Sequence, residues 1–194
     1  MTYALKNLLR IVWIPILLLL TYPVHANASV NNFIVFAQTC GVTAVIASAR
    51  VFSDNDKKQW KEYASPKEVP GNAEWSEIAY VWAKPDSPVA IDVEGLGEDF
   101  GDSAYYCFET SGRLSSIEHE FRTAWDWGFT EQRQFDSAGK ETTKSHFFST
   151  KDRKEIPRPQ GANDVREAMT VKVYKRLSDV PFFSLLTGST PAQW

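Results

Sequence analysis

Two histidines and two glutamates are the residues whose types and spacing could bind a metal or carry catalysis. His119 and His146 occupy equivalent places in a repeated motif, which predicts one face of an antiparallel sheet for both. Strands two apart in such a sheet lie roughly 10 Å from each other, and a zinc site takes three or four ligands. The third histidine, His25, falls in a predicted signal peptide. We therefore expect structural histidines and assign no metal site.

Glu118 and Glu120 are spaced so that both side chains leave the same face of a strand. Glycoside hydrolysis uses two carboxyl groups that face each other across the bond, roughly 5–10 Å apart. Neighbours on one strand do not meet that geometry convincingly, and cations on adjacent strands favour a solvated charged face. The candidate cations are Arg122, Arg133 and Lys144. A glycan-directed hydrolase of the envelope, with unidentified carboxylates, remains the alternative.

An acidic stretch around the glycine-rich loop 95–101 is the other candidate for cation binding. Calcium takes several oxygen ligands, but the alternating acidic spacing of an EF-hand loop is missing here. The chain also contains no Ser–His–Asp signature, phosphate-binding glycine loop, Cys-x-x-Cys or His-Glu-x-x-His motif. We assign no catalytic residue and no cofactor. The carboxylates of this stretch are Glu94, Glu98, Asp99 and Asp102.

Aromatic residues around a predicted hairpin corner at 125–128 are the most suggestive feature for ligand binding. Exposed tryptophans can stack on a sugar or hold an apolar group, whereas buried ones in a small β domain form core. We predict a binding protein and favour the absence of enzymatic activity. Its ligand would be apolar or amphiphilic, or a partner protein, on a concave sheet face. The alternative role of these aromatic residues is core packing. The alternative function of the protein is that of a structural or inhibitor module. The predicted ligand-binding residues are Trp125, Trp127, Phe129 and Phe148.

The N-terminal segment 1–28 predicts a cleaved secretory signal. Lys6 and Arg10 precede an apolar run from Ile11 to Leu20, and small residues precede a cleavage site after Ala28. A membrane anchor is the alternative, but a spanning helix needs roughly 20 apolar residues. We expect one exported domain, 29–194, periplasmic or secreted and without a stable membrane span. Cleavage moves the formal net charge from −3 to −5, which argues against nucleic-acid partners.

The exported chain contains two cysteines, Cys40 and Cys107. In an oxidising compartment such a pair favours a disulfide. Closing a loop of that length would stabilise the fold by roughly 4 kcal/mol. Two buried free thiols are the alternative.

One motif occurs twice at a fixed offset: FETSGR at 108–113 recurs as FDSAGK at 135–140. This motif predicts a hairpin corner followed by a return strand. It consists of an aromatic residue, an acidic residue, two intervening residues, a glycine and a basic residue. The two units resemble the turn of the YD repeats in bacterial Rhs-type shells, with phenylalanine in place of tyrosine and Lys140 in place of arginine. This resemblance covers about 30 residues and implies stacked hairpins within 103–150, with no catalytic residues.

The alternation of apolar and polar residues predicts a mainly β (α+β) fold. We expect a twisted antiparallel β-meander of about six to eight strands, with one or two short helices packed on it. Residues 33–51 fit either a strand or a helix, with strand favoured from Val45 to Ser53. The short helices are expected at 163–169 and 178–186. The strands expected in the repeat region are 103–109, 113–123, 127–136 and 140–149.

Overall fold

The computed structural model describes residues 36–42, 50–54, 59–64, 68–69, 77–83, 86–97 and 99–188. The predicted signal peptide lies outside these described residues, as does the part of the predicted strand from Val45 to residue 49. Within the described ranges, no helix is long and apolar enough to cross a membrane.

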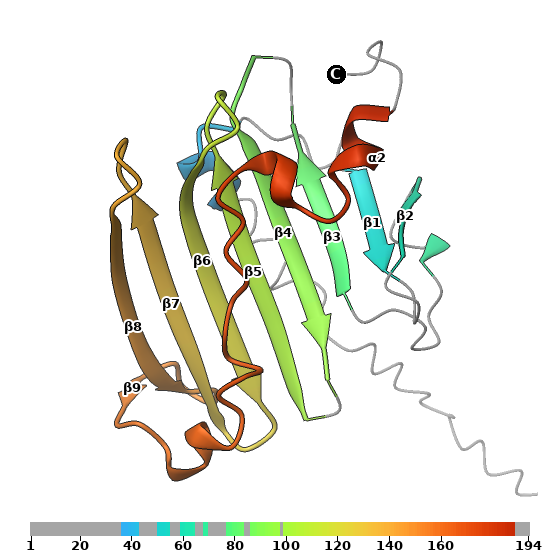
Figure 1. Cartoon of the computed structure of the whole chain (residues 1–194). Helices are drawn as coiled ribbons and strands as arrows, with labels where there is room; N and C mark the ends of the chain where they lie inside the picture. Colours follow the sequence, from blue (N-terminus) through green and yellow to red (C-terminus); the bar gives the residue numbers. More distant parts are fainter. Residues whose placement is uncertain are drawn as a thin grey trace, which may run out of the picture.

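The described residues form one nine-stranded antiparallel sheet, which is the framework of the fold (Figure 1). It runs as a meander except at its start, where β1 lies between β2 and β3. The predicted antiparallel meander with short helices is therefore confirmed. The strand count exceeds the expected six to eight, in part because a two-residue strand adds to the β8 edge. The strands are β1 (Arg50–Asp54), β2 (Trp60–Tyr63), β3 (Glu77–Trp82), β4 (Val89–Leu96), β5 (Phe100–Phe108), β6 (Leu114–Thr123), β7 (Trp127–Phe135), β8 (Glu141–Ser149) and β9 (Glu155–Ile156).

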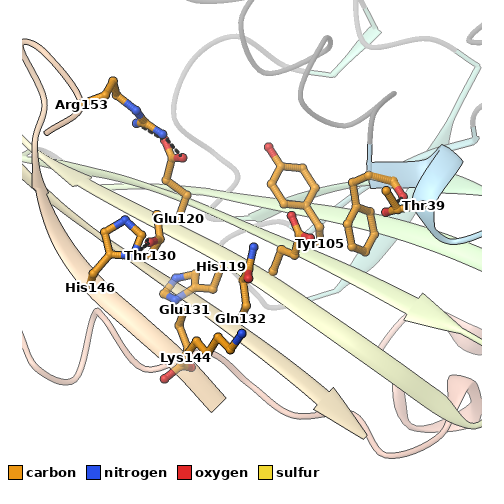
Figure 2. A pocket seen from close by; sticks show the side chains of 12 residues that line it. Thr39, Tyr105, His119, Glu120, Thr130, Glu131, Gln132, Lys144, His146 and Arg153 are labelled. Carbon is orange, nitrogen blue, oxygen red and sulfur yellow. Dashed lines mark hydrogen bonds and ion pairs between the residues drawn. The ribbon is translucent and has the colours of Figure 1, made fainter. Parts of the chain in front are cut away.

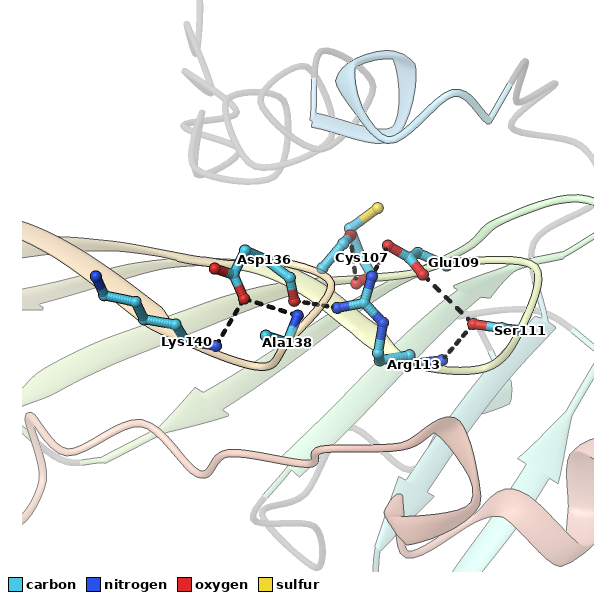
Figure 3. Close-up of polar contacts among 8 residues, drawn as sticks. Cys107, Glu109, Ser111, Arg113, Asp136, Ala138 and Lys140 are labelled. Carbon is cyan, nitrogen blue, oxygen red and sulfur yellow. Dashed lines mark hydrogen bonds and ion pairs between the residues drawn. The ribbon is translucent and has the colours of Figure 1, made fainter.

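The repeated motif forms two equivalent hairpin turns, between β5 and β6 and between β7 and β8 (Figure 3). Gly112 and Gly139 have φ angles of 78° and 80°, in the left-handed region that glycine adopts without steric cost. In each turn the glycine N–H donates to the carbonyl of the acidic residue three positions earlier, Glu109 or Asp136. The Arg113 guanidinium also donates to the carbonyl of Asp136, so the two turns are joined side by side.

One face of the sheet, the core face, bears the odd-numbered residues of β4, β7 and β8, the odd-numbered residues of β6 from Ile117 onward and the even-numbered residues of β5. The C-terminal segment crosses this face diagonally (Figure 1). Apolar side chains of the segment, including Phe182 and Leu186, pack there against the sheet. The segment contains the helices η3 (Gln160–Asn163), η4 (Leu177–Asp179) and α2 (Phe183–Gly188).

The opposite face, the cleft face, bears the alternate residues and is partly covered by residues 36–42. Residues 36–39 form a helical turn, so this part of the ambiguous 33–51 stretch is helical. Apolar side chains of the turn pack on Trp82, Ala90 and Tyr105. Cys40 and Cys107 form the predicted disulfide, with a Cα–Cα distance of 5.7 Å. A disulfide is compatible with an oxidising, extracellular compartment.

Three local expectations differ from the structure. The glycine-rich loop 95–101 is mostly strand, because β4 continues to Leu96 and β5 begins at Phe100. Residues 164–169 of the helix expected at 163–169 are turns, and Asn163 is the last residue of the 3₁₀ helix η3. Ala162 of η3 and Met169 of the turns are buried against Phe121 and Trp127, so tertiary packing replaces a regular amphipathic helix. In the last expected helix, 178–186, only residues from Phe183 onward are α-helical.

Candidate functional site

The four predicted ligand-binding aromatics do not form one surface. Trp125 lies in the β6–β7 turn and is 50% exposed. Trp127 and Phe129 lie on the core face, packed with Phe121 beneath the C-terminal segment. Phe148 lies on the cleft face, where it is buried. Because strand residues alternate between faces, the rings of Trp127 and Phe129 point to one face of the sheet and the ring of Phe148 points to the other.

Phe148 is buried because Gly128 leaves space for its ring and Arg153 covers the ring. Gly128 lies opposite Phe148 in the register of β7 and β8, and a Cβ atom at this glycine would come within 2.3 Å of the Phe148 ring. The guanidinium of Arg153 covers the ring at 4.1 Å from its centroid. The ring therefore supports Arg153 from below.

The two histidines lie on opposite faces, which corrects the expectation of a shared face. His119 pairs with Glu131, and Glu131 pairs with Ser145, so the position of β8 that is aligned with His119 is Ser145. The sequence repeat instead matches His119 with His146, and a displacement of one residue moves a side chain to the other face. His146 accordingly pairs with Thr130 on the cleft face.

His119 is a buried residue of the core face. Its Nε2 lies 2.7 Å from Oδ1 of Asp102, and its ring meets the Phe129 ring edge-on. Asp102 thus lies on the core face, whereas Glu94 lies on the cleft face. Glu98 lies outside the described residues. Within the described part of the chain, no three or more His, Cys, Asp or Glu side chains are grouped closely enough to hold a metal ion.

The cleft face contains a cavity of about 500 Å³. Figure 2 shows its side chains, which come from β5 to β8, the helical turn and the β8–β9 turn. His119 and Glu131 border the cavity from positions that alternate toward the core face. The cleft floor consists of Glu118, Glu120, Thr130, Gln132, Lys144 and His146.

Arg153 forms one wall of the cleft. Its backbone has a φ of 62°, a left-handed conformation that is costly for any residue with a Cβ. Its guanidinium donates to both carboxylate oxygens of Glu120, at 2.9 and 2.7 Å, and Arg122 also donates to Glu120. Burial alone would raise the pKa of the Glu120 carboxyl, but the two arginines more than offset it and lower the pKa. Glu120 is therefore held as a carboxylate.

The other wall is aromatic. Phe36 and Thr39 of the helical turn line it together with Tyr105, and the Phe36 and Tyr105 ring centroids are 5.5 Å apart. Within segment 36–42, the N–H groups of Cys40, Gly41 and Val42 donate to carbonyl groups of the helical turn. The disulfide at Cys40 and apolar packing therefore hold this wall on the sheet.

Two carboxyl groups near the aromatic wall differ from Glu120. Burial raises the pKa of Glu118, which has no ion pair with any described residue. Asp92 is buried between Tyr80 and Tyr105. Burial, followed by the charges of Glu94 and Asp102, raises the pKa of Asp92 well above its ordinary value. This favours a neutral carboxylic acid at Asp92.

The arrangement provides hydrogen-bond donors and acceptors on an open polar floor. The carboxylate of Glu120 is fixed by arginine, and the carboxyl group of Glu118 has a raised pKa. Sequence analysis considered Glu118 and Glu120 and favoured a solvated charged face, and it overlooked Thr130, Gln132 and His146 as their neighbours. Alternation places Thr130 and Gln132 on one face of β7, but the register between strands decides that Glu118, Glu120 and His146 share this face. No protein-family model, curated protein or solved structure matches this chain.

Proposed function

We propose that this chain is an exported, non-enzymatic binding protein and that the cleft holds a small polar ligand. The observation that carries the proposal is a cavity of about 500 Å³ with a polar floor between two dissimilar walls. Cavities of about 300–1,000 Å³ are typical of small-molecule sites. The disulfide and the predicted signal peptide support export to a periplasmic or extracellular compartment.

The chemistry of the lining favours a polar ligand over the apolar or amphiphilic one predicted from the sequence. Of the four aromatic residues predicted from the sequence, Trp127 and Phe129 pack in the core and Arg153 covers Phe148, whereas the exposed Trp125 lies in the β6–β7 turn and does not line the cleft. In the cleft, Gln132 offers an amide that both donates and accepts hydrogen bonds, and Thr130 and His146 bond to each other. A ligand with several hydrogen-bonding groups matches this floor, with Phe36 and Tyr105 as an apolar contact.

Native mass spectrometry tests the proposal. The full exported protein, purified from its own compartment, should carry a small molecule that is released on denaturation. Gln132→Ala should reduce the bound fraction, because it removes an amide from the floor. Gln134→Ala is the matched control, since Gln134 lies on the same face of β7 but does not line the cleft. No bound molecule, or equal loss in both variants, would contradict the proposed site.

A hydrolase is the second candidate, and one observation favours it. Glu118 and Glu120 have pKa values shifted in opposite directions, which is the pattern of an acid paired with a fixed carboxylate. Against it, Arg153 engages both oxygens of Glu120, which leaves neither free as a nucleophile. Turnover of a released ligand by wild type, lost in Glu118→Gln, would favour the hydrolase over the binding protein.

A further inference from the structure

Charges on the cleft floor divide into those paired within the protein and those without a protein partner. Glu120 is paired, because Arg153 and Arg122 both bind its carboxylate. Glu118 and Lys144 have neither an ion pair nor a side-chain hydrogen bond with any residue in the described ranges. The floor therefore presents one carboxyl group and one ammonium group to a ligand.

These two opposite charges lie in a single row across the sheet. Glu118 pairs with Gln132, and Gln132 pairs with Lys144. Adjacent strands are about 4.8 Å apart, so the backbones of Glu118 and Lys144 are separated by about 10 Å. The Gln132 amide lies between them, where it can donate to and accept from a peptide-like group.

The residues that surround Glu118 differ from those that surround Lys144. Glu118 lies beside Tyr105 in the register of β5 and β6, and Phe36 packs on Tyr105. Aromatic faces next to a carboxylate attract ammonium groups. At the other end of the row, Lys144 shares its strand face with His146. The row thus has a carboxyl group beside aromatic rings at one end and an ammonium group at the other.

We infer that the ligand is a zwitterion of short-peptide length, with its ammonium group toward Glu118 and Tyr105 and its carboxylate toward Lys144. This inference rests on the proposed function of the cleft and names the ligand class. An extended peptide advances about 3.4 Å per residue, so two or three residues span the row.

Trialanine is the probe, titrated into the full exported protein labelled with nitrogen-15. Shifts of the Thr130 and Gln132 amide signals should report its binding in the cleft. N-acetyl-trialanine lacks the ammonium group and trialanine amide lacks the carboxylate, so each should bind about fivefold more weakly. Added salt should weaken trialanine binding.

Two variants test which end of the peptide each protein charge binds. If two groups interact directly, the effects of removing each one are not additive. In Glu118→Gln, trialanine and N-acetyl-trialanine should bind equally well, whereas trialanine amide should still bind more weakly than trialanine. Lys144→Gln should do the reverse. Glu155→Gln and Lys140→Gln are matched controls, because both residues are exposed and neither lines the cleft. Both controls should behave as wild type.

Equal binding of the three peptides overturns the inference, as does the absence of any cleft shift with trialanine. The peptide comparison needs no variant, so a misfolded substitution does not affect it. The proposed function is judged separately by the molecule released in native mass spectrometry. An uncharged ligand released there would overturn the zwitterion and leave the proposed function standing.

Discussion

Replacing Gly128 by alanine should destabilise the protein by about 2–3 kcal/mol, the upper part of the range for overpacking a core. The added Cβ would lie 2.3 Å from the Phe148 ring and 2.8 Å from the carbonyl oxygen of Phe121. Ordinary carbon contacts lie at about 3.5–4.0 Å. Phe148 has little room to retreat, since it is 1% exposed and Arg153 covers it. The Phe121 carbonyl belongs to the adjacent strand, so its retreat would distort the sheet.

Gly101→Ala is a matched control with the opposite expected sign. Gly101 and Gly128 both pair with Arg122, from the two sides of β6, and a Cβ at Gly101 would meet nothing within 4 Å. Alanine there should leave stability unchanged or raise it by up to about 1 kcal/mol, because the unfolded chain loses conformational freedom.

Urea unfolding of the oxidised protein measures both variants against wild type. A change in midpoint at constant slope reports a change in stability. The Phe148→Leu background should lower the cost of Gly128→Ala, because a smaller side chain relieves the closer of the two clashes. Equal midpoints for Gly128→Ala and Gly101→Ala would refute the packing argument.

Two further predictions concern the disulfide and Asp92. Replacing Cys40 and Cys107 by alanine should cost about 4 kcal/mol in urea unfolding, since the disulfide joins residues 67 positions apart; two titratable thiols in denatured, unreduced protein would contradict the bridge. The pKa of Asp92 is raised in the folded state above the reference value of 3.8, so its contribution to stability is fully present below that value and is lost as the pH rises toward the folded pKa. Asp92→Asn should therefore gain stability relative to wild type as the pH rises above about 4, and a difference in urea unfolding that stays constant with pH would count against a buried neutral acid.

The strands and turns of the repeat region follow from local sequence. Alternation with a period of two marks each strand, and glycine at a left-handed position marks each corner. The predicted strand 127–136 differs from β7 by one residue at its end, and the predicted 113–123 differs from β6 by one residue at its start. The ends of the C-terminal helices were less predictable, because packing on the core face determines where Phe182 and Leu186 lie.

The cleft shows where local information ends. Alternation predicts that Glu118 and Glu120 share a face, but the register between strands determines what lies beside them. One residue of difference between the repeat offset and the sheet register places His119 in the core and His146 in the cleft. Register is a property of pairing between strands, so neither histidine could be assigned a face from the repeat alone.

The sequence by itself determined the meander, its repeated corners and the pairing of two cysteines, because strand alternation, left-handed glycines and an even cysteine count are local or compositional properties. Only the tertiary structure decided the two walls of the cleft. Arg153 reaches Glu120 across 33 positions in the sequence, and Cys40 brings Phe36 and Thr39 over the sheet through a bond to Cys107. Such contacts depend on how the chain returns to the sheet, which no periodicity within one segment specifies.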